Sequence, residues 1–342
     1  MSSRPSAMML YSSQRRQPMI YYPAMKNRKL RAGDRVRVRF PEEILSTLDA
    51  DGALDGVPFM PEMLDWCGKP FRVQRRVEKT CVDGYPVRCF PADDVVILDS
   101  PRCDGQGHGG CRHGCRIFWK EAWLHPVDAE ATTAPVSETA LRELRARLKV
   151  KRDEQHYFCQ STELYKATGD FPGRQKVAAV RIVLREIRGG DLSMPEVLKL
   201  FVLWSWQKLQ RAAGADRSLQ GPHKRTPGES LSLKPGEVVR VKSRAQIVAT
   251  LDQNSRNRGM GICCEMTRCC GREAEVRYRV DRLIDERTGK MRELTDTVAL
   301  QNLRGQALGE ECLCYGQLGD CPRGELMYWR EIWLERVNRL GT

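Results

Sequence analysis

Cysteine is the residue type in this chain best suited to chemistry, and six cysteines lie in two short clusters. The 342-residue sequence holds 14 cysteines in all. One cluster, residues 103–115, has the sequence CDGQGHGGCRHGC, and the other, residues 312–321, has the sequence CLCYGQLGDC. Glycines between cysteines let the backbone turn so that several thiolates face one ion, and zinc prefers four ligands at tetrahedral angles. Both clusters therefore predict metal sites.

Each predicted site also takes a cysteine from a Cys-Gly pair far upstream of its cluster. The predicted ligands of the first site are Cys67, Cys103, Cys111 and Cys115. Those of the second site come from Cys270, Cys312, Cys314 and Cys321, and its fourth ligand stays open because Glu325 stands where the first cluster has Cys115. Further candidate ligands are Cys81, Cys89, His108 and His113 in the first half and Cys263, Cys264 and Cys269 in the second.

Zinc is the cofactor that we expect at these sites. An iron–sulfur cluster also uses four thiolates and is the first alternative, and small buried thiols without any metal are the second. Disulfides are less expected, since residues 1–30 lack the continuous apolar stretch of an export signal. The most apolar stretch, residues 197–206, is far shorter than the roughly 20 residues that span a bilayer. We therefore expect a cytoplasmic protein without a transmembrane segment.

The sequence predicts no catalytic residue. It contains no glycine-rich phosphate loop, nucleophile elbow or His-Glu metal motif. His156 and Cys159 are close enough in sequence to form a base and a nucleophile, but no oxyanion motif accompanies them. Glu121 and Glu331 occupy matching positions in the two halves, where an ion pair with a nearby arginine is favoured over an acid in a site.

The two clusters belong to an internal repeat that organises the whole chain. FWKEAWL at residues 118–124 is matched by YWREIWL at residues 328–334, and residues 33–77 align without a gap onto residues 236–280. The repeat divides the chain as follows: a tail (1–30), a first module (31–127), a central segment (128–230) and a second module (231–340).

Each module is predicted to be mostly β structure, and the central segment to be helical. The modules open with KLRAGDRVRVRF and LKPGEVVRVKS, in which valines alternate with polar residues as in a half-buried strand. This opening resembles the entry strand of SH3-like small barrels of the KOW type. The central segment holds helical patterns at residues 137–152, 175–188 and 193–211. The predicted fold class is α+β, with two SH3-like small β-barrel modules separated by a helical unit.

Four segments carry a wider resemblance. They are FMPEMLDWCGK, CDGQGHGGC followed by FWKEAWL, YFCQSTELYKAT, and YWREIWLERV. Together they resemble a bacterial protein family with two cysteine-rich modules, and the resemblance covers most of the chain beyond residue 30. No activity is established for that family, so it implies a layout and no catalytic or binding residue. Glu325 and the extra cysteines of ICCEMTRCC depart from its pattern in the second metal site.

The charge of the chain lies mainly outside the modules. The net charge is +13, and residues 1–33 carry seven basic residues and no acidic one, while residues 136–230 carry 18 basic and 11 acidic residues. We therefore expect a non-catalytic zinc-binding interaction scaffold or accessory protein with a protein partner. The alternative is a nucleic-acid-binding protein that uses the tail and the central helices. The second alternative is an enzyme or accessory factor of cell-envelope polysaccharide or specialised metabolism.

Overall fold

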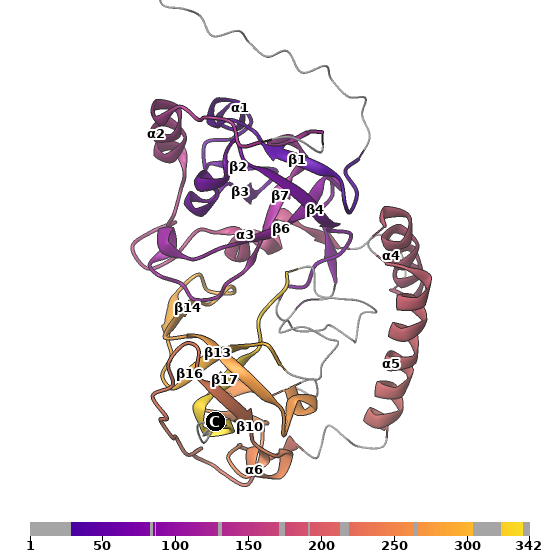
Figure 1. Cartoon of the computed structure of the whole chain (residues 1–342), viewed down its shortest axis with the longest axis vertical. Coiled ribbons are helices and arrows are strands. Elements are labelled where there is room, and N and C mark those ends of the chain that lie inside the picture. The colour runs from indigo at the N-terminus through magenta and orange to yellow at the C-terminus, as the bar shows by residue number, and fades with distance from the viewer. Residues whose placement is uncertain are drawn as a thin grey trace, which may run out of the picture.

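The structure is a computed structural model that describes residues 29–82, 85, 87–128, 132–170, 175–190, 192–212, 219–262, 266–303 and 323–337. These residues form two lobes and two successive long helices that run beside them (Figure 1). The first lobe comprises residues 29–170 and the second lobe residues 219–337. Each lobe is built on one five-stranded antiparallel sheet.

The sheet of the first lobe has the strand order β7-β6-β4-β1-β8. Its strands are β1 (Arg35–Val38), β4 (Pro70–Arg76), β6 (Val95–Arg102), β7 (Arg116–Lys120) and β8 (Leu124–Pro126). The first strand therefore lies beside the last, with β1 pairing β8 so that Val38 faces Leu124. A bulge interrupts the pairing of β4 with β6 between Val73 and Arg75.

The sheet of the second lobe has the corresponding order, β17-β16-β13-β10-β18. Its strands are β10 (Val238–Val241), β13 (Glu273–Arg279), β16 (Thr297–Gln301), β17 (Tyr328–Arg330) and β18 (Leu334–Arg336). Val241 faces Leu334, and the bulge recurs between Val276 and Tyr278. Within the described ranges no ladder joins β7 to β8 or β17 to β18, so neither sheet closes. The α+β class is as predicted, but the closed barrels implied by the SH3-like resemblance are not seen.

Short elements connect the strands in both lobes. In the first lobe they are α1 (Pro41–Leu45), β2 (Ala53–Leu54), β3 (Val57–Pro58), η1 (Pro61–Trp66), β5 (Arg88–Cys89), η2 (Gln106–His108), η3 (Glu121–Trp123), α2 (Glu138–Arg147), α3 (Gln160–Ala167) and β9 (Gly169–Asp170). In the second they are α6 (Arg244–Val248), β11 (Arg256–Asn257), β12 (Met260–Gly261), η5 (Met266–Cys269), β14 (Arg282–Ile284), β15 (Met291–Glu293) and η7 (Glu331–Trp333).

Two fully buried tryptophans anchor the core of each lobe. Trp119 and Trp123 fill the first core, and Trp329 and Trp333 fill the second. The one-turn helices η3 and η7 turn the chain between each pair, so both side chains face inward. The indole Nε1 of Trp123 donates to Thr47 at 3.0 Å, and Trp333 donates to Thr250 at 3.0 Å. These aromatic side chains are core residues rather than a ligand platform.

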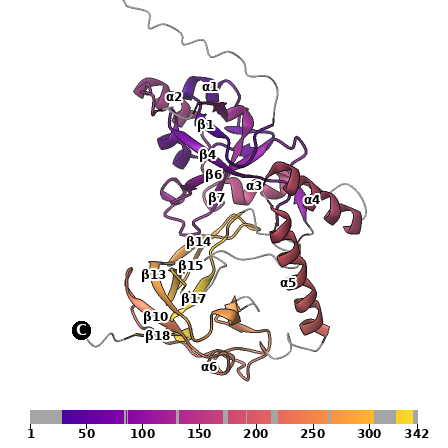
Figure 2. The same ribbon diagram turned by 45° about the vertical axis from the view of Figure 1, so that its right-hand side comes forward.

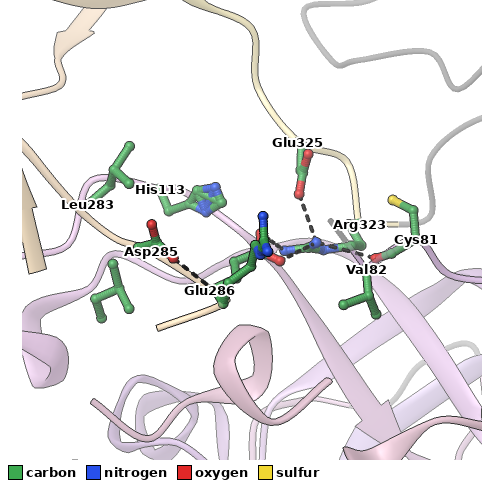
Figure 3. Close-up of a pocket in the computed structure, with 10 residues that line it drawn as sticks. Cys81, Val82, His113, Leu283, Asp285, Glu286, Arg323 and Glu325 are labelled. Atoms are coloured by element: carbon green, nitrogen blue, oxygen red, sulfur yellow. Dashed lines mark hydrogen bonds and ion pairs between the residues drawn. The ribbon is translucent and has the colours of Figure 1, made fainter. Parts of the chain in front are cut away.

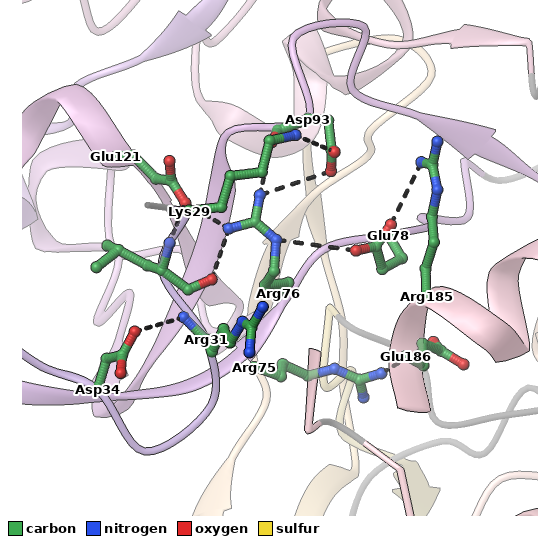
Figure 4. Close-up of polar contacts among 11 residues, drawn as sticks. Lys29, Arg31, Asp34, Arg75, Arg76, Glu78, Asp93, Glu121, Arg185 and Glu186 are labelled. Carbon is green, nitrogen blue, oxygen red and sulfur yellow. Dashed lines mark hydrogen bonds and ion pairs between the residues drawn. The ribbon is translucent and has the colours of Figure 1, made fainter. Parts of the chain in front are cut away.

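The matched glutamates lie at the same place in each core and bind arginine. Glu121 accepts the backbone N–H of Leu30 at 2.9 Å and pairs with Arg76, whose guanidinium also contacts Asp93 (Figure 4). Glu331 is fully buried and pairs with Arg279 at 2.5 Å. Both glutamates therefore brace the segment that enters the sheet.

The predicted central helical unit divides between two places. Helices α2 and α3 pack on the first lobe, where Leu144 and Leu164 join the core cluster. Helices α4 (Gln175–Gly189) and α5 (Met194–Ala212) follow one another along the side of the two lobes (Figure 2). Amphipathic spacing predicted α2, α4 and α5 but not α3, and it did not indicate which surface each helix would cover. No helix in the described part of the chain is both long and apolar enough to cross a bilayer.

Candidate metal centre between the lobes

The first cysteine cluster forms the loop between β6 and β7. Cys103 follows β6, and Cys111 and Cys115 follow the one-turn helix η2. The backbone N–H of Cys103 donates to the carbonyl of Cys115 at 2.9 Å, which closes the loop. Gly105 has a left-handed φ of 70°, and a Cβ there would lie 2.0 Å from the carbonyl oxygen of Cys111. The loop is therefore folded tightly enough to need glycine at this position.

Four cysteines line one small cavity of about 30 Å³ beneath this loop. They are Cys103, Cys111, Cys115 and Cys159. Three come from the loop, whereas Cys159 is the N-cap of α3, which packs on the first lobe. His108, His113, Ser161 and Ile284 complete much of the wall. Ile284 belongs to β14 of the second lobe, so the cavity lies where the two lobes meet.

Cys67 does not line this cavity, although we predicted it as the fourth ligand. It lies 4 % exposed in the hydrophobic core of the first lobe, at the end of η1. Burial raises the pKa of its thiol to about 12. The structure thus places Cys159, and not Cys67, beside the other three.

The predicted ligands of the second module lie mostly outside the described residues. Cys312, Cys314 and Cys321 are among the residues not described, as are Cys263 and Cys264. Cys270 packs against the core of the second lobe, at the position that matches Cys67, and Cys269 is buried in that core. The nine described cysteines are all free thiols.

Backbone N–H groups point at the sulfurs of the cavity. The amides of Gly105, His113 and Ser161 each follow a cysteine by two residues and act to lower the pKa of that thiol, in Cys103, Cys111 and Cys159 respectively. The N–H of Ile284 reaches the Cys111 sulfur from the second lobe at 3.4 Å. Such donors stabilise a sulfur that carries negative charge, as a metal-bound thiolate does.

Cys115 differs from its neighbours because it faces cationic groups. Its sulfur lies 3.3 Å from Nδ1 of His113 and 3.4 Å from the hydroxyl of Ser161. Burial acts to raise the pKa of Cys115, but the charge of His113, its hydrogen bond and the charge of Arg323 outweigh burial and lower the pKa. Burial also acts to lower the pKa of His113, and the Cys115 thiolate raises it to about 9.

The other three thiols have raised pKa values, because burial disfavours their charge. The pKa of Cys103 lies well above its ordinary value, that of Cys111 is raised, and that of Cys159 is raised to about 12. A metal ion reverses this effect, since it binds the deprotonated thiolate. Without such a positive charge, these thiols stay protonated.

His108 supports the loop from below and is engaged at both ring nitrogens. Its Nδ1 lies 2.7 Å from the carboxylate of Glu62, and its Nε2 lies 3.1 Å from the carbonyl of Phe158. Glu62 also accepts the N–H of Gly107 at 3.1 Å. The histidine therefore ties η1, the cysteine loop and the segment before α3 together, with neither nitrogen free to bind a metal.

A second cavity of about 440 Å³ adjoins the first through His113 and Ile284 (Figure 3). His113, Glu286 and Glu325 present ligand atoms within 4.8 Å of one another on its wall. Both carboxylates already bind the buried guanidinium of Arg323, which lies 2.9 Å from Glu325 and contacts Glu286 with both nitrogens. This group is therefore an ion-pair network rather than a metal site.

The Cys159–His156 pair considered as a nucleophile and base is not formed. His156 Nδ1 lies 2.7 Å from Asp153 on the surface, while Cys159 is buried with a pKa of about 12. A thiol with so high a pKa is a poor nucleophile. Comparisons of the chain with protein-family models, with curated proteins and with solved structures give no match.

Proposed function

We propose that this protein is a non-catalytic metal-binding scaffold, in which a metal centre held by Cys103, Cys111, Cys115 and Cys159 fastens its two lobes together. One observation carries this proposal: four cysteines from two separate segments line a single cavity at the contact between the lobes. Thiolates in sets of four are the ligands of structural metal sites.

The chemistry of the cavity supports a bound metal over plain buried thiols. Buried thiols gain little from lying together, and without a cation the ionisation of Cys103, Cys111 and Cys159 is unfavourable. The N–H groups aimed at three of the sulfurs are the donors that a thiolate ligand needs. Metal binding and the folding of such a loop are one event, because the unfolded chain holds no preformed site.

Hydrogen bonds around the proposed centre support its role in joining the two lobes. The N–H of Arg112 donates to the carbonyl of Arg282 at 2.9 Å, and the N–H of Tyr157 donates to that of Gly289 at 2.8 Å. The hydroxyl of Tyr328 donates to the carbonyl of His113 at 2.7 Å. Both the cysteine loop and the Cys159 segment thus bind the second lobe, close to the residues that would hold the metal.

We infer further that the two lobes are SH3-like modules that arose by internal duplication. The support is the shared strand order, the bulge at matching positions and the Trp-to-Thr hydrogen bond present in each. On this view the second lobe supplies a wall of the metal cavity while the first supplies the ligands.

Metal analysis of the full-length protein tests the proposal. Elemental analysis after purification without chelators should find bound metal, and Cys159→Ser should remove most of it. Cys67→Ser is the matched control, because Cys67 is equally buried but lies away from the cavity, and it should retain the metal. Metal-free wild-type protein, or equal loss in both variants, would show that the cavity is not the centre. Alkylation of Cys115 in the metal-loaded protein would indicate a free thiol instead.

A further inference from the structure

This inference rests on the proposed metal centre and concerns what it holds. We propose that the four cysteines bind an iron–sulfur cluster of the four-iron type, rather than the single zinc ion that the sequence led us to expect. Two independent features of the cavity lead to this proposal: the separation of the sulfurs and the space between them.

The sulfurs stand too far apart for one zinc ion. Four sulfurs at about 2.3 Å from a tetrahedral zinc lie roughly 3.8 Å from one another. Within the described residues, two sets of three candidate ligand atoms lie within 4.8 Å of one another. They are Glu62 with Cys103 and His108, and His113 with Glu286 and Glu325. No three of the four cysteine sulfurs form such a set. In a four-iron cluster each thiolate binds a different iron, so the ligands are spread more widely.

The space between the cysteines also favours a cluster over a single zinc ion. Sulfurs that surround a zinc ion are nearly in van der Waals contact, so they leave no room for a water-sized sphere between them. Here about 30 Å³ is open to the centre of such a sphere, about twice what one water molecule needs. The ligand set therefore encloses a guest larger than a bare ion.

The surroundings suit a cluster that is shielded from water and held by hydrogen bonds. Cys111 and Cys159 are less than 10 % exposed, and Met60 and Ile284 provide apolar walls. Amide N–H groups face the sulfurs of Cys103, Cys111 and Cys159. Hydrogen bonds to the sulfurs and limited solvent exposure are the two means by which a protein stabilises and tunes such a cluster.

The test is anaerobic purification of the full-length chain, with iron, sulfide and zinc measured on the same sample. We expect about four iron and four sulfide per chain, a brown protein with a broad absorption near the blue end of the visible spectrum, and bleaching by dithionite. Cys103→Ser and Cys159→Ser should each lose most of the colour and iron. Cys67→Ser and Cys270→Ser should retain both, since Cys67 lies in the core of the first lobe and Cys270 packs against the core of the second.

The possible outcomes separate the cluster from the metal centre on which it rests. About one zinc per chain, without sulfide and lost in Cys159→Ser, would overturn the cluster and leave the metal centre standing. A protein without zinc, iron or sulfide, both as purified and after anaerobic reconstitution with iron and sulfide, would overturn both proposals. Iron and sulfide that persist in Cys103→Ser and Cys159→Ser would place a cluster elsewhere and overturn the assignment of these ligands.

Discussion

The two matched glutamates, Glu121 half-buried and Glu331 fully buried, differ in how many of their carboxylate oxygens accept hydrogen bonds. Both contacts of Glu121, with the N–H of Leu30 and with Arg76, fall on one carboxylate oxygen. Glu331 receives N–H groups on both oxygens: Leu231 and Ser232 bind one, and Leu233 and Arg279 bind the other. A glutamine at position 121 can still turn its one carbonyl oxygen toward both donors. A glutamine at position 331 must instead point its NH₂ group, itself a donor, at a backbone or guanidinium N–H.

Glu331→Gln should therefore destabilise the protein more than Glu121→Gln. We expect a loss of about 2–4 kcal/mol in the free energy of unfolding for Glu331→Gln, because a fully buried site is left with opposed donors. For Glu121→Gln we expect about 1 kcal/mol. Urea denaturation followed by circular dichroism measures both, with Glu335→Gln on the exposed end of β18 as the control. Equal losses of unfolding free energy for Glu121→Gln and Glu331→Gln would contradict this account of the carboxylate oxygens.

The choice between Cys67 and Cys159 shows what residue spacing could predict. Cys103, Cys111 and Cys115 line one cavity, as expected of near neighbours in a glycine-rich loop, while their role as metal ligands stays a prediction. The Cys-Gly pair recurs in both modules because both cores need it, and this made Cys67 look like a ligand. Cys159 lies 44 residues beyond Cys115, and only the packing of α3 on the first lobe brings it close. Local spacing carries no signal of that packing.

At the scale of elements, the loop around η2 depends on the close approach of its own backbone. Gly105 and Gly110 both have left-handed φ values, of 70° and 75°. Only at Gly105 would an added Cβ meet backbone, 2.0 Å from the Cys111 oxygen; at Gly110 its nearest contact is 3.7 Å away. An alanine would therefore be strained by the left-handed backbone at both positions, but it would clash with neighbouring atoms only at position 105.

Gly105→Ala should abolish the metal centre, whereas Gly110→Ala should keep it. Each alanine costs about 1–2 kcal/mol for its left-handed backbone, and this part is common to both. The clash at position 105 additionally forces Cys103 and Cys111 apart, so the bound metal per chain should fall by most of its value. Metal analysis and thermal unfolding of the two variants provide the comparison, and similar metal content in both would argue against a tight loop.

A pH effect is expected where the turn before β16 meets the β11–β12 hairpin. The hydrogen bond from Arg258, at 2.7 Å, lowers the pKa of Asp296 below its ordinary value. A depressed carboxyl pKa contributes stability that is present above the unfolded value of about 4 and is lost as the pH falls through the folded value. Asp296 has a φ of 50°, which asparagine also tolerates.

Asp296→Asn should therefore lower the unfolding free energy by about 0.5–1 kcal/mol at pH 7. The difference from wild type should shrink as the pH falls below about 4, because the wild-type carboxyl is then protonated as well. Denaturation curves between pH 7 and pH 3 measure it, with Asp281→Asn at an exposed position as the control. A difference that stays constant over this range would point to packing rather than charge.

The positions of strands were predictable from the sequence, but sheet closure and the packing of helices on the sheets were not. Alternating valines in residues 35–38 and 238–241 correctly predicted β1 and β10, since one face of each strand is buried. The SH3-like barrels stay a prediction, because neither sheet closes within the described residues and closure depends on pairing between the two edge strands, which no local pattern encodes. For the same reason, the apolar stripe of α2 predicted a helix but not the surface against which that helix packs.

At the scale of the whole molecule, the proposed metal centre lies where segments that are very distant in sequence meet. The N–H of Ile284 and the Cys111 sulfur that it binds are separated by 173 residues. Bringing such segments together costs conformational entropy, and this cost must be offset by contacts at the junction. Hydrogen bonds from both backbone and side chains are described at this contact, and the proposed metal would add to what they contribute.

Removing the metal should therefore loosen the contact between the lobes before it unfolds either one. The backbone N–H groups of Arg112, Tyr157 and Ile284 all donate across this contact, and we expect their hydrogen exchange to accelerate at least tenfold in metal-free protein. The amides of the central strands β4 and β13 should keep their protection, because each lobe has its own tryptophan core.

Hydrogen-exchange mass spectrometry on the metal-loaded and metal-free full chain provides the measurement. Cys159→Ser should behave like the metal-free protein without further treatment, and a chelator should change it no more. Cys67→Ser should respond to metal removal as the wild type does. If β4 loses protection together with the three junction amides, the metal stabilises the core of the first lobe rather than the contact. If the junction amides do not change at all, the lobes are held together by their packing alone.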